Sequence, residues 1–406
     1  MESVDVLVVG GGSAGLSVSH ELASLGIDHV VLERGRIGQT WRDRWDSFCL
    51  VTPNWSVRLP GGAYAGHEPD GFMPRDEIVA HLVRYAAASG APVREGVAVR
   101  TLDRTPGGFV ARTSAGDLHA ARVVLGTGAF QRAHRPTDSD TLPAGLLQID
   151  IEAYRNAASL PPGPILVVGS GQSGCQLAEE LREAGRDVVL SCGKAPWAPR
   201  RIGGRDLVWW LQASGFLDQP VASLPSPAAR LGANPLATGH GGGHDLNLRT
   251  LRAMGVTLVG HFLGAAGHQG RFAPDLADTV AWGDARYREI RELVHRAADE
   301  RGLPRPEMAD PGPFDGAAPE GVSLDEFGAV VFAGGFRPDF RSWLPWADAF
   351  DEMGFPIQFD GASAVVEGLF FVGIHFLRTR KSSTLFGVGE DAAIVARTIA
   401  ERMASA

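Results

Sequence analysis

Apolar residues along the chain gather in short runs that end at glycine clusters. Residues 4–9 and 165–168 are two such runs, and each leads through a glycine-rich turn into a stretch that alternates apolar and polar positions. The runs have strand character, and the stretches that follow, at residues 13–25 and about 173–184, have the period of a helix. Gly26 and Gly185 follow these helices and favour a left-handed stop. Each unit therefore predicts strand, turn and helix.

The turns carry the spacing of the dinucleotide-binding fingerprint. Its glycines let the backbone turn sharply and approach a pyrophosphate, which then lies on the helix N-terminus. One such match is weak evidence, but two in matching contexts within one chain are strong. We predict that the two turns bind coenzymes through Gly10, Gly12, Ser13 and Gly15 in the first, and Gly169, Gly171, Gln172, Ser173 and Gly174 in the second.

The end of the strand after each helix predicts whether the bound coenzyme has a free ribose hydroxyl or a ribose 2′-phosphate. Residues 29–32 end at Glu33 and Arg34, where an acid is expected to accept a hydrogen bond from a ribose hydroxyl. Residues 187–191 end instead at Cys192. The cations that follow, Lys194, Arg200 and Arg201, suit a ribose 2′-phosphate and so predict NADPH, although a solvated charged loop is the alternative.

Two further apolar runs, residues 121–125 and 328–332, also end at glycines. The first leads into Thr127 and Gly128, which we predict to contact a coenzyme. Both runs are interpreted as buried strands that return to a flavin-binding half. The expected fold is α/β with two Rossmann-like domains: an FAD domain in two parts (residues 1–160 and 326–406) split by an inserted NADPH domain (residues 161–325). The prolines at 161, 162 and 164 would form the hinge.

Composition excludes several other classes of protein. The net charge of -9 argues against a nucleic-acid partner. No apolar run is long enough to span a membrane, and we expect neither a signal peptide nor a location other than the cytoplasm. The 3 cysteines lack the C-x-x-C spacing of a thiol–disulfide redox pair. Whether the chain forms a homodimer stays open.

Several motifs outside the fingerprints resemble those of class B flavin monooxygenases. The resemblance covers nearly the whole chain and is closest to bacterial flavoproteins and to the plant enzymes that make auxin. The motifs occupy residues 37–42, 44–48, 50–55, 71–75, 203–206, 209–211, 378–382 and 387–391. The resemblance implies that Gln39, Thr40 and Trp41 lie against the flavin and that Asn54 is a catalytic residue near the edge of its ring system. A turn residue after Pro53 is the alternative for Asn54.

The resemblance also implies an activity. It is that of an NADPH-dependent FAD monooxygenase that uses dioxygen, through a flavin C4a-hydroperoxide, to oxygenate a small organic substrate at nitrogen, sulfur or a carbonyl carbon. In such chemistry the protein positions the coenzymes and excludes water. The alternative is an FAD-dependent oxidase or dehydrogenase with a degenerate nicotinamide site. A nucleotide-sensing regulatory flavoprotein is less favoured, because the residues of the flavin face are present.

Two positions depart from the family pattern. Asp150 stands where relatives have a histidine, four residues before the aromatic Tyr154, and Gly334 replaces a threonine. Asp150 would either repel a phosphorylated nicotinamide or pair with a neighbouring arginine.

Two other groups of residues are candidates for a site. His240, His244 and Asp245 are potential metal ligands, but their glycine neighbours favour a flexible loop, and we expect no metal. The aromatic residues Trp209, Trp210, Phe216, Trp343 and Trp346 would either wall a substrate cavity or belong to the core.

Overall fold

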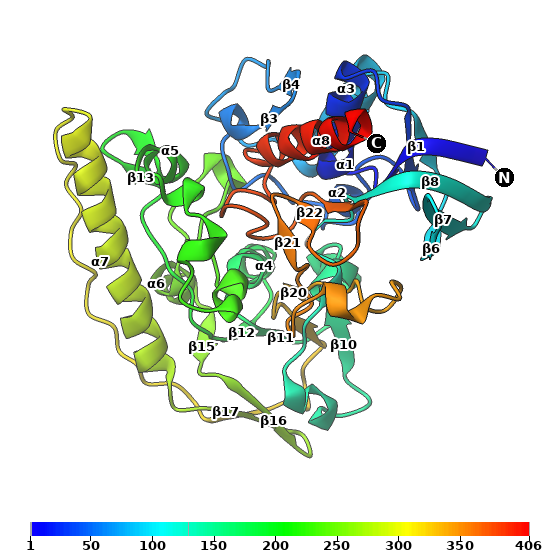
Figure 1. Cartoon of the computed structure of the whole chain (residues 1–406). Coiled ribbons are helices and arrows are strands. Elements are labelled where there is room, and N and C mark those ends of the chain that lie inside the picture. The colour runs from blue at the N-terminus through cyan, green and yellow to red at the C-terminus, as the bar shows by residue number, and fades with distance from the viewer. Residues whose placement is uncertain (1, 129, 406) are drawn as a thin grey trace.

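The computed structural model describes residues 2–128 and 130–405, which contain two main sheets, the first mixed and the second parallel (Figure 1). The first sheet has the strand order β21-β22-β23-β8-β1-β2-β5, and β7 and β6 extend it from β8. Its strands are β1 (Glu2–Val9), β2 (His29–Glu33), β5 (Val93–Glu95), β6 (Val99–Thr105), β7 (Gly108–Thr113), β8 (Gly116–Leu125), β21 (Gln358–Phe359), β22 (Ala362–Ser363) and β23 (Leu369–Phe371).

The second sheet is parallel throughout, in the order β10-β19-β11-β12-β15. Its strands are β10 (Leu147–Asp150), β11 (Ile165–Val168), β12 (Val188–Ser191), β15 (Thr257–Val259) and β19 (Ala329–Phe332). The two fingerprints follow β1 and β11, and each strand is buried along the part that enters its turn. Parallel strands buried on both faces need such continuous apolar runs.

Helices cover both sheets. In the first domain, α1 (Ser13–Ser24) lies beside the C-terminal helix α8 (Val388–Ala404), so the two ends of the sequence meet in one layer (Figure 1). The short α2 (Gln39–Arg42) and the longer α3 (Arg75–Ala88) complete that side. In the second domain, α4 (Gln172–Glu183) packs on β11 and β12, and α6 (Leu248–Ala253) lies beside it.

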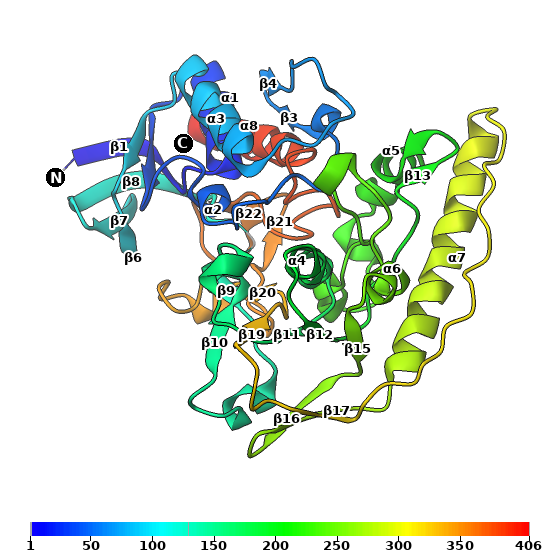
Figure 2. The same cartoon turned by 180° about the vertical axis from the view of Figure 1, so that it is seen from behind.

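The remaining elements surround the junction and the far edge of the second domain. The helix α7 (Leu276–Glu300) runs along that edge and packs on α5 (Leu207–Ala213) (Figure 2). Short paired strands are β3 (Arg58–Leu59) with β4 (Gly62–Ala63), β9 (Arg132–Ala133) with β20 (Phe336–Arg337), β13 (Arg201–Ile202) with β14 (Arg205–Asp206), and β16 (Phe262–Ala266) with β17 (Gln269–Phe272) and β18 (Gly321–Ser323). No described helix is long and apolar enough to cross a membrane.

The predicted α/β fold with a split first domain is confirmed, and one strand assignment is wrong. Residues 121–125 do lie in the first sheet, within β8. Residues 329–332, expected to return to the flavin half, pair instead with β10 and β11 in the second sheet. A fully buried apolar strand suits the middle of either parallel sheet, so its composition did not specify the partner. The domain limits at residues 160 and 325, as coenzyme-binding units, stay a prediction.

Candidate functional site

The first glycine turn forms a cradle at the start of α1. Gly10 has a φ of +110°, and a Cβ there would lie 2.6 Å from the carbonyl oxygen of Gly126, at the end of β8. A Cβ on Gly15 would overlap the carbonyl oxygen of Gly10. Gly12, by contrast, faces open space. Two glycines thus fix the turn and the third leaves room for a ligand against the half-buried Ser13.

The second turn repeats this geometry at the start of α4. Gly169 also has a φ of +110°, and its Cβ would lie 2.7 Å from the carbonyl oxygen of Ala333, at the end of β19. Gly174 abuts the carbonyl oxygen of Gly169, and Gly171 faces open space. A ligand-sized gap before free helical N–H groups suits a pyrophosphate, so the residues of both turns fit a dinucleotide.

Glu33 lies at the end of β2 and is buried. Its two carboxylate oxygens accept hydrogen bonds from the N–H groups of Gly11 and Gly35, both at 2.7 Å. The carboxylate therefore holds the fingerprint turn in place, and each oxygen keeps a second lone pair for a ribose hydroxyl. Arg34 follows at the surface.

The residues that the resemblance placed against the flavin lie in α2. The Gln39 side chain donates to Asp43 at 2.9 Å and accepts from the Arg36 N–H, Thr40 is exposed, and Trp41 packs on Phe48 with ring centroids 5.8 Å apart. Gly38, just before them, has a φ of +71° and donates its N–H to the carbonyl oxygen of Gly11 at 3.2 Å, so α2 begins beside the first glycine turn.

Asn54 is buried, and its side-chain amide forms hydrogen bonds with the backbone of the segment from 68 to 73. It donates to the carbonyl oxygen of Glu68 at 2.9 Å and accepts from the N–H of Met73 at 2.7 Å. Its side chain therefore organises the segment from 68 to 73.

Thr127 and Gly128 follow β8, and both accept hydrogen bonds from the side-chain amide of Gln131. Gln131 donates to the Thr127 hydroxyl at 2.9 Å and to the Gly128 carbonyl oxygen at 3.0 Å. The same side chain accepts from the N–H of Asp339 at 2.6 Å, so it links this turn to the segment that follows β20.

The segments that follow the two cradles meet at a pair of aromatic rings, which the sequence did not identify as part of a site. Gly126 and Ala333 touch the first and second cradles, respectively. A few residues beyond them, Phe130 and Phe336 pack edge to face with centroids 5.3 Å apart. His375, beyond β23, packs on the same Phe130 ring at 5.0 Å. The crevices at the carboxyl ends of both sheets therefore open toward each other here.

The three cations predicted to bind a ribose phosphate differ in their surroundings. Lys194 is exposed, as is Arg201, which lies 3.5 Å from Asp206. Arg200 is buried: its guanidinium lies 2.9 Å from Asp206, donates to the carbonyl oxygen of Val51 at 2.7 Å and covers the Phe72 ring. Lys194 and Arg201 are thus accessible to a phosphate, whereas Arg200 holds the two domains together.

The structure resolves the alternatives left open for Asp150. Its carboxylate accepts two hydrogen bonds from the Arg135 guanidinium, at 2.7 and 2.9 Å. A bidentate pair of this kind neutralises the acid locally. Gly334 lies where a Cβ would be 2.5 Å from the carbonyl oxygen of His134, so the position has no room for the threonine of relatives.

The glycine-rich loop around His240 is fixed to α4. His240 and His244 lie 2.9 and 2.6 Å from the carboxylates of Glu183 and Glu179, respectively. The expectation of a flexible loop missed these contacts because glycine spacing does not reveal where an intervening histidine points. Within the described ranges no group of three or more His, Cys, Asp and Glu residues could hold a metal ion.

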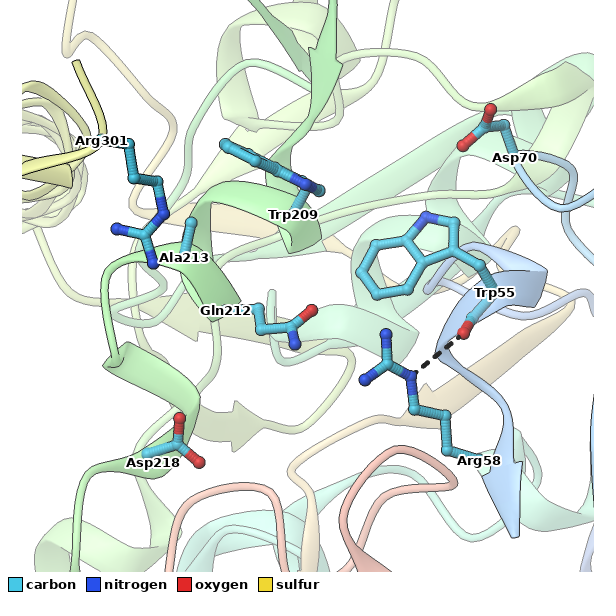
Figure 3. Close-up of a pocket in the computed structure, with 8 residues that line it drawn as sticks. All are labelled: Trp55, Arg58, Asp70, Trp209, Gln212, Ala213, Asp218 and Arg301. Atoms are coloured by element: carbon cyan, nitrogen blue, oxygen red, sulfur yellow. Dashed lines mark hydrogen bonds between the residues drawn. The ribbon is translucent and has the colours of Figure 1, made fainter. Parts of the chain in front are cut away.

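A cavity of about 560 Å³ lies between the two domains (Figure 3). Trp55, from the segment before β3, and Trp209, from α5, line it from opposite sides. Arg58 contributes a guanidinium 5.6 Å from the Trp55 ring. Of the aromatic residues expected to wall a cavity, only Trp209 is among its lining residues, whereas Trp210 is buried.

Comparison with known proteins identifies the family. A family described as pyridine nucleotide-disulphide oxidoreductase matches residues 7–213. An uncharacterized CzcO-like oxidoreductase of Geobacillus kaustophilus is 29% identical over 391 residues, which cover 96% of each chain. Indole-3-pyruvate monooxygenase YUCCA1 of rice is 29% identical over 180 residues, covering 43% of this chain and 44% of its own.

Solved structures agree on the fold. The flavin-containing monooxygenase of Stenotrophomonas maltophilia superposes with a TM-score of 0.71 at 19% identity, covering 99% of this chain and all of its own. The predicted resemblance to flavin monooxygenases is confirmed by these relatives. The chain belongs to the pyridine nucleotide-disulphide oxidoreductase family and is a flavin-dependent oxidoreductase.

Proposed function

We propose that the protein is an NADPH-dependent FAD monooxygenase that oxygenates a small organic substrate at nitrogen, sulfur or a carbonyl carbon. The observation that supports this proposal is the pair of matched glycine cradles. The segments that follow them, after Gly126 and Ala333, meet at the ring pair of Phe130 and Phe336. Such an arrangement lets a dinucleotide in one crevice present its reactive end to a dinucleotide in the other. The names of the relatives support the same class of reaction.

The first cradle would hold FAD, with Gly10, Gly12, Ser13 and Gly15 around its pyrophosphate and Glu33 on a ribose. When bound and reduced, the flavin supplies the electrons that activate dioxygen. The chain contributes position and exclusion of water. In this proposal Asn54 acts by holding the segment from 68 to 73 over the site, since both ends of its amide already bind that backbone.

The second cradle would hold NADPH. Gly169, Gly171, Gln172, Ser173 and Gly174 surround its pyrophosphate, and the accessible cations Lys194 and Arg201 face the 2′-phosphate. Arg200 has a positioning role, because Asp206 and Val51 occupy its guanidinium.

The cavity between Trp55 and Trp209 would receive the substrate. Its volume suits a small organic molecule, and pockets of this size commonly combine aromatic walls with a few polar groups. Its position at the junction of the domains places it beside the segment that Asn54 holds.

The second candidate is an FAD-dependent oxidase or dehydrogenase with a degenerate nicotinamide site. The second cradle keeps the glycine geometry of the first, and Arg135 neutralises Asp150, so neither departure from the family pattern removes the site. Disulfide reduction is less favoured still. Burial raises the pKa of Cys49, Cys175 and Cys192, the 3 cysteines of the chain, which disfavours their reactive thiolates.

Rapid mixing separates these functions. The purified protein is first mixed with NADPH without oxygen, and the loss of the oxidised flavin absorbance is followed. Oxygenated buffer is then added. A monooxygenase should show a transient absorbance distinct from both redox states of the flavin. Immediate return to the oxidised spectrum with release of one hydrogen peroxide per flavin would instead identify an oxidase, and failure to be reduced would exclude NADPH as the donor.

A further inference from the structure

His375 lies at the end of the first crevice without a role in the function proposed so far. It follows β23, whose carboxyl end passes the fingerprint helix: a Cβ on Gly373 would lie 2.6 Å from the Cβ of Ala14, in the first turn of α1. Two residues later the imidazole and the Phe130 ring form a T-shaped pair with centroids 5.0 Å apart. The ring thus stands beyond the first cradle, at the point where the two crevices meet.

The imidazole is held in one orientation and keeps one nitrogen available. Nδ1 lies 2.9 Å from the hydroxyl of Ser383. Within residues 2–128 and 130–405, Nε2 has no hydrogen-bond partner. Burial lowers the pKa of His375 to about 4, so the ring is neutral at neutral pH. A neutral imidazole fixed through one nitrogen presents the other as a single donor or acceptor of defined direction.

The backbone beside His375 is strained. Phe376 has a φ of +48°, a conformation that a bulky residue rarely adopts and that costs about 1–3 kcal/mol. Such strain is retained where the surrounding structure must aim a particular side chain. Phe376 itself is buried, and the imidazole of His375 immediately before it contacts Phe130.

We propose that Nε2 of His375 makes a hydrogen bond to the polar edge of the flavin ring system and that Ser383 positions the imidazole for it. The inference rests on the proposed function in one respect, the presence of a flavin in the first cradle. It adds a residue that contacts the ring itself, whereas the fingerprint contacts the pyrophosphate. The chemical groups that it would recognise are the carbonyl oxygens and ring nitrogens of the isoalloxazine.

The test uses the full chain freed of flavin and reconstituted with FAD. His375→Phe keeps a flat ring against Phe130 and removes the hydrogen bond. We expect it to raise the dissociation constant for FAD about fivefold, the size of one net hydrogen bond. It should also shift the absorption maximum and the midpoint potential of the bound flavin. Ser383→Ala should move the spectrum and potential in the same direction by less, and His375→Gln should restore part of the affinity.

The matched control is His119, which pairs with the hydroxyl of Ser3 at 3.2 Å near the amino end of the same sheet. His119→Phe should leave FAD affinity, spectrum and potential unchanged. If the wild-type chain takes up no FAD, the proposed function fails. If it takes up FAD and His375→Phe changes neither spectrum nor potential, the inference about His375 alone is wrong. Should His375→Phe fail to fold, an unchanged spectrum and potential in Ser383→Ala would contradict the inference in the same way.

Discussion

At the scale of single residues, glycines determine the shape of the two coenzyme cradles, because no side chain fills the space beside their Cα atoms. The glycine spacing was readable from the sequence because a left-handed turn and close backbone approach both require glycine. The surroundings were not readable. Nothing in the residues around Glu33 indicated that two backbone N–H groups would occupy its carboxylate, or that Arg200 would be buried against Asp206. Those outcomes depend on segments far away in sequence.

The open glycines give a selective test of the two cradles. Gly12→Ala and Gly171→Ala each add a methyl group where the protein has no atom within 4 Å, so the fold should be unaffected. In the presence of a pyrophosphate the same methyl would collide. We expect Gly12→Ala to weaken FAD at least tenfold, about 1.4 kcal/mol, and Gly171→Ala to weaken NADPH by a similar factor. Calorimetric titration measures both, and equal effects of one variant on both coenzymes would contradict the assignment.

Charge at the second cradle predicts coenzyme preference. Lys194→Ala and Arg201→Ala remove accessible cations, so each should raise the Michaelis constant for NADPH several-fold while leaving that for NADH nearly unchanged. Steady-state kinetics with both coenzymes provide the measurement. Arg205→Ala serves as the control, since its guanidinium covers the Trp209 ring at 4.1 Å rather than facing the turn. A parallel loss with NADPH and NADH would remove the 2′-phosphate from the proposal.

The depressed pKa of His375 predicts a dependence of stability on pH. The pKa is about 4 in the folded chain against 6.5 for the free side chain, so the unfolded state takes up the proton first. This contribution to stability is complete above pH 6.5, falls as the pH drops toward 4, and is then constant. The full loss should be on the order of 3 kcal/mol. Urea unfolding of the wild type and of His375→Gln at pH 7 and pH 4.5 should show a smaller decrease in the variant; equal decreases would contradict the shift.

At the scale of elements, repeated local signals were predictable and pairing partners were not. The helices at residues 13–24 and 172–183 follow from their periodicity and their glycine stops. The strands β10 and β19 pair with each other in the second sheet, although the apolar run at residues 328–332 predicts a strand of the flavin half. Both are short, and β19 is buried on every residue. Sheet membership of such a strand is set by which neighbours its connections reach, which periodicity does not encode.

The loop before α6 is held in place by hydrogen bonds to a side chain of helix α4. The Gln172 amide accepts from the N–H of Ala237 at 3.0 Å and donates to its carbonyl oxygen. Gln172→Ala would leave both backbone groups without these partners, so we expect the free energy of unfolding to fall by about 1–3 kcal/mol. Chemical denaturation measures it. Gln212→Ala, at the surface of the interdomain cavity, should change it by less than about 0.5 kcal/mol.

On the scale of the whole molecule, a strap joins the two domains next to the substrate cavity. The segment from 217 to 221, after α5, pairs antiparallel with residues 378–381, before α8. Val221 donates to the carbonyl oxygen of Arg378 at 2.8 Å, and Lys381 donates to that of Leu217 at 3.2 Å. The Lys381 ammonium also lies 2.6 Å from Asp218 and 2.5 Å from Glu390. Burial opposes its charge, yet these hydrogen bonds raise its pKa, so the pair of domains is fixed by a charged contact as well as by backbone.

If FAD and NADPH occupy the two cradles as proposed, this strap and the contact between Phe130 and Phe336 predict that the flavin is reduced without a rotation of one domain against the other. Pro220 and Thr379 face each other across an antiparallel bridge, a geometry that accommodates a disulfide. In the double variant Pro220→Cys with Thr379→Cys, oxidation should therefore leave the rate of flavin reduction by NADPH within about twofold of the reduced form. The single variants, treated with the same oxidant, control for the native cysteines. If forming the disulfide stops flavin reduction and dithiothreitol restores it, the domains must move apart or turn during catalysis, and the observed arrangement would be only one of the states that the enzyme visits.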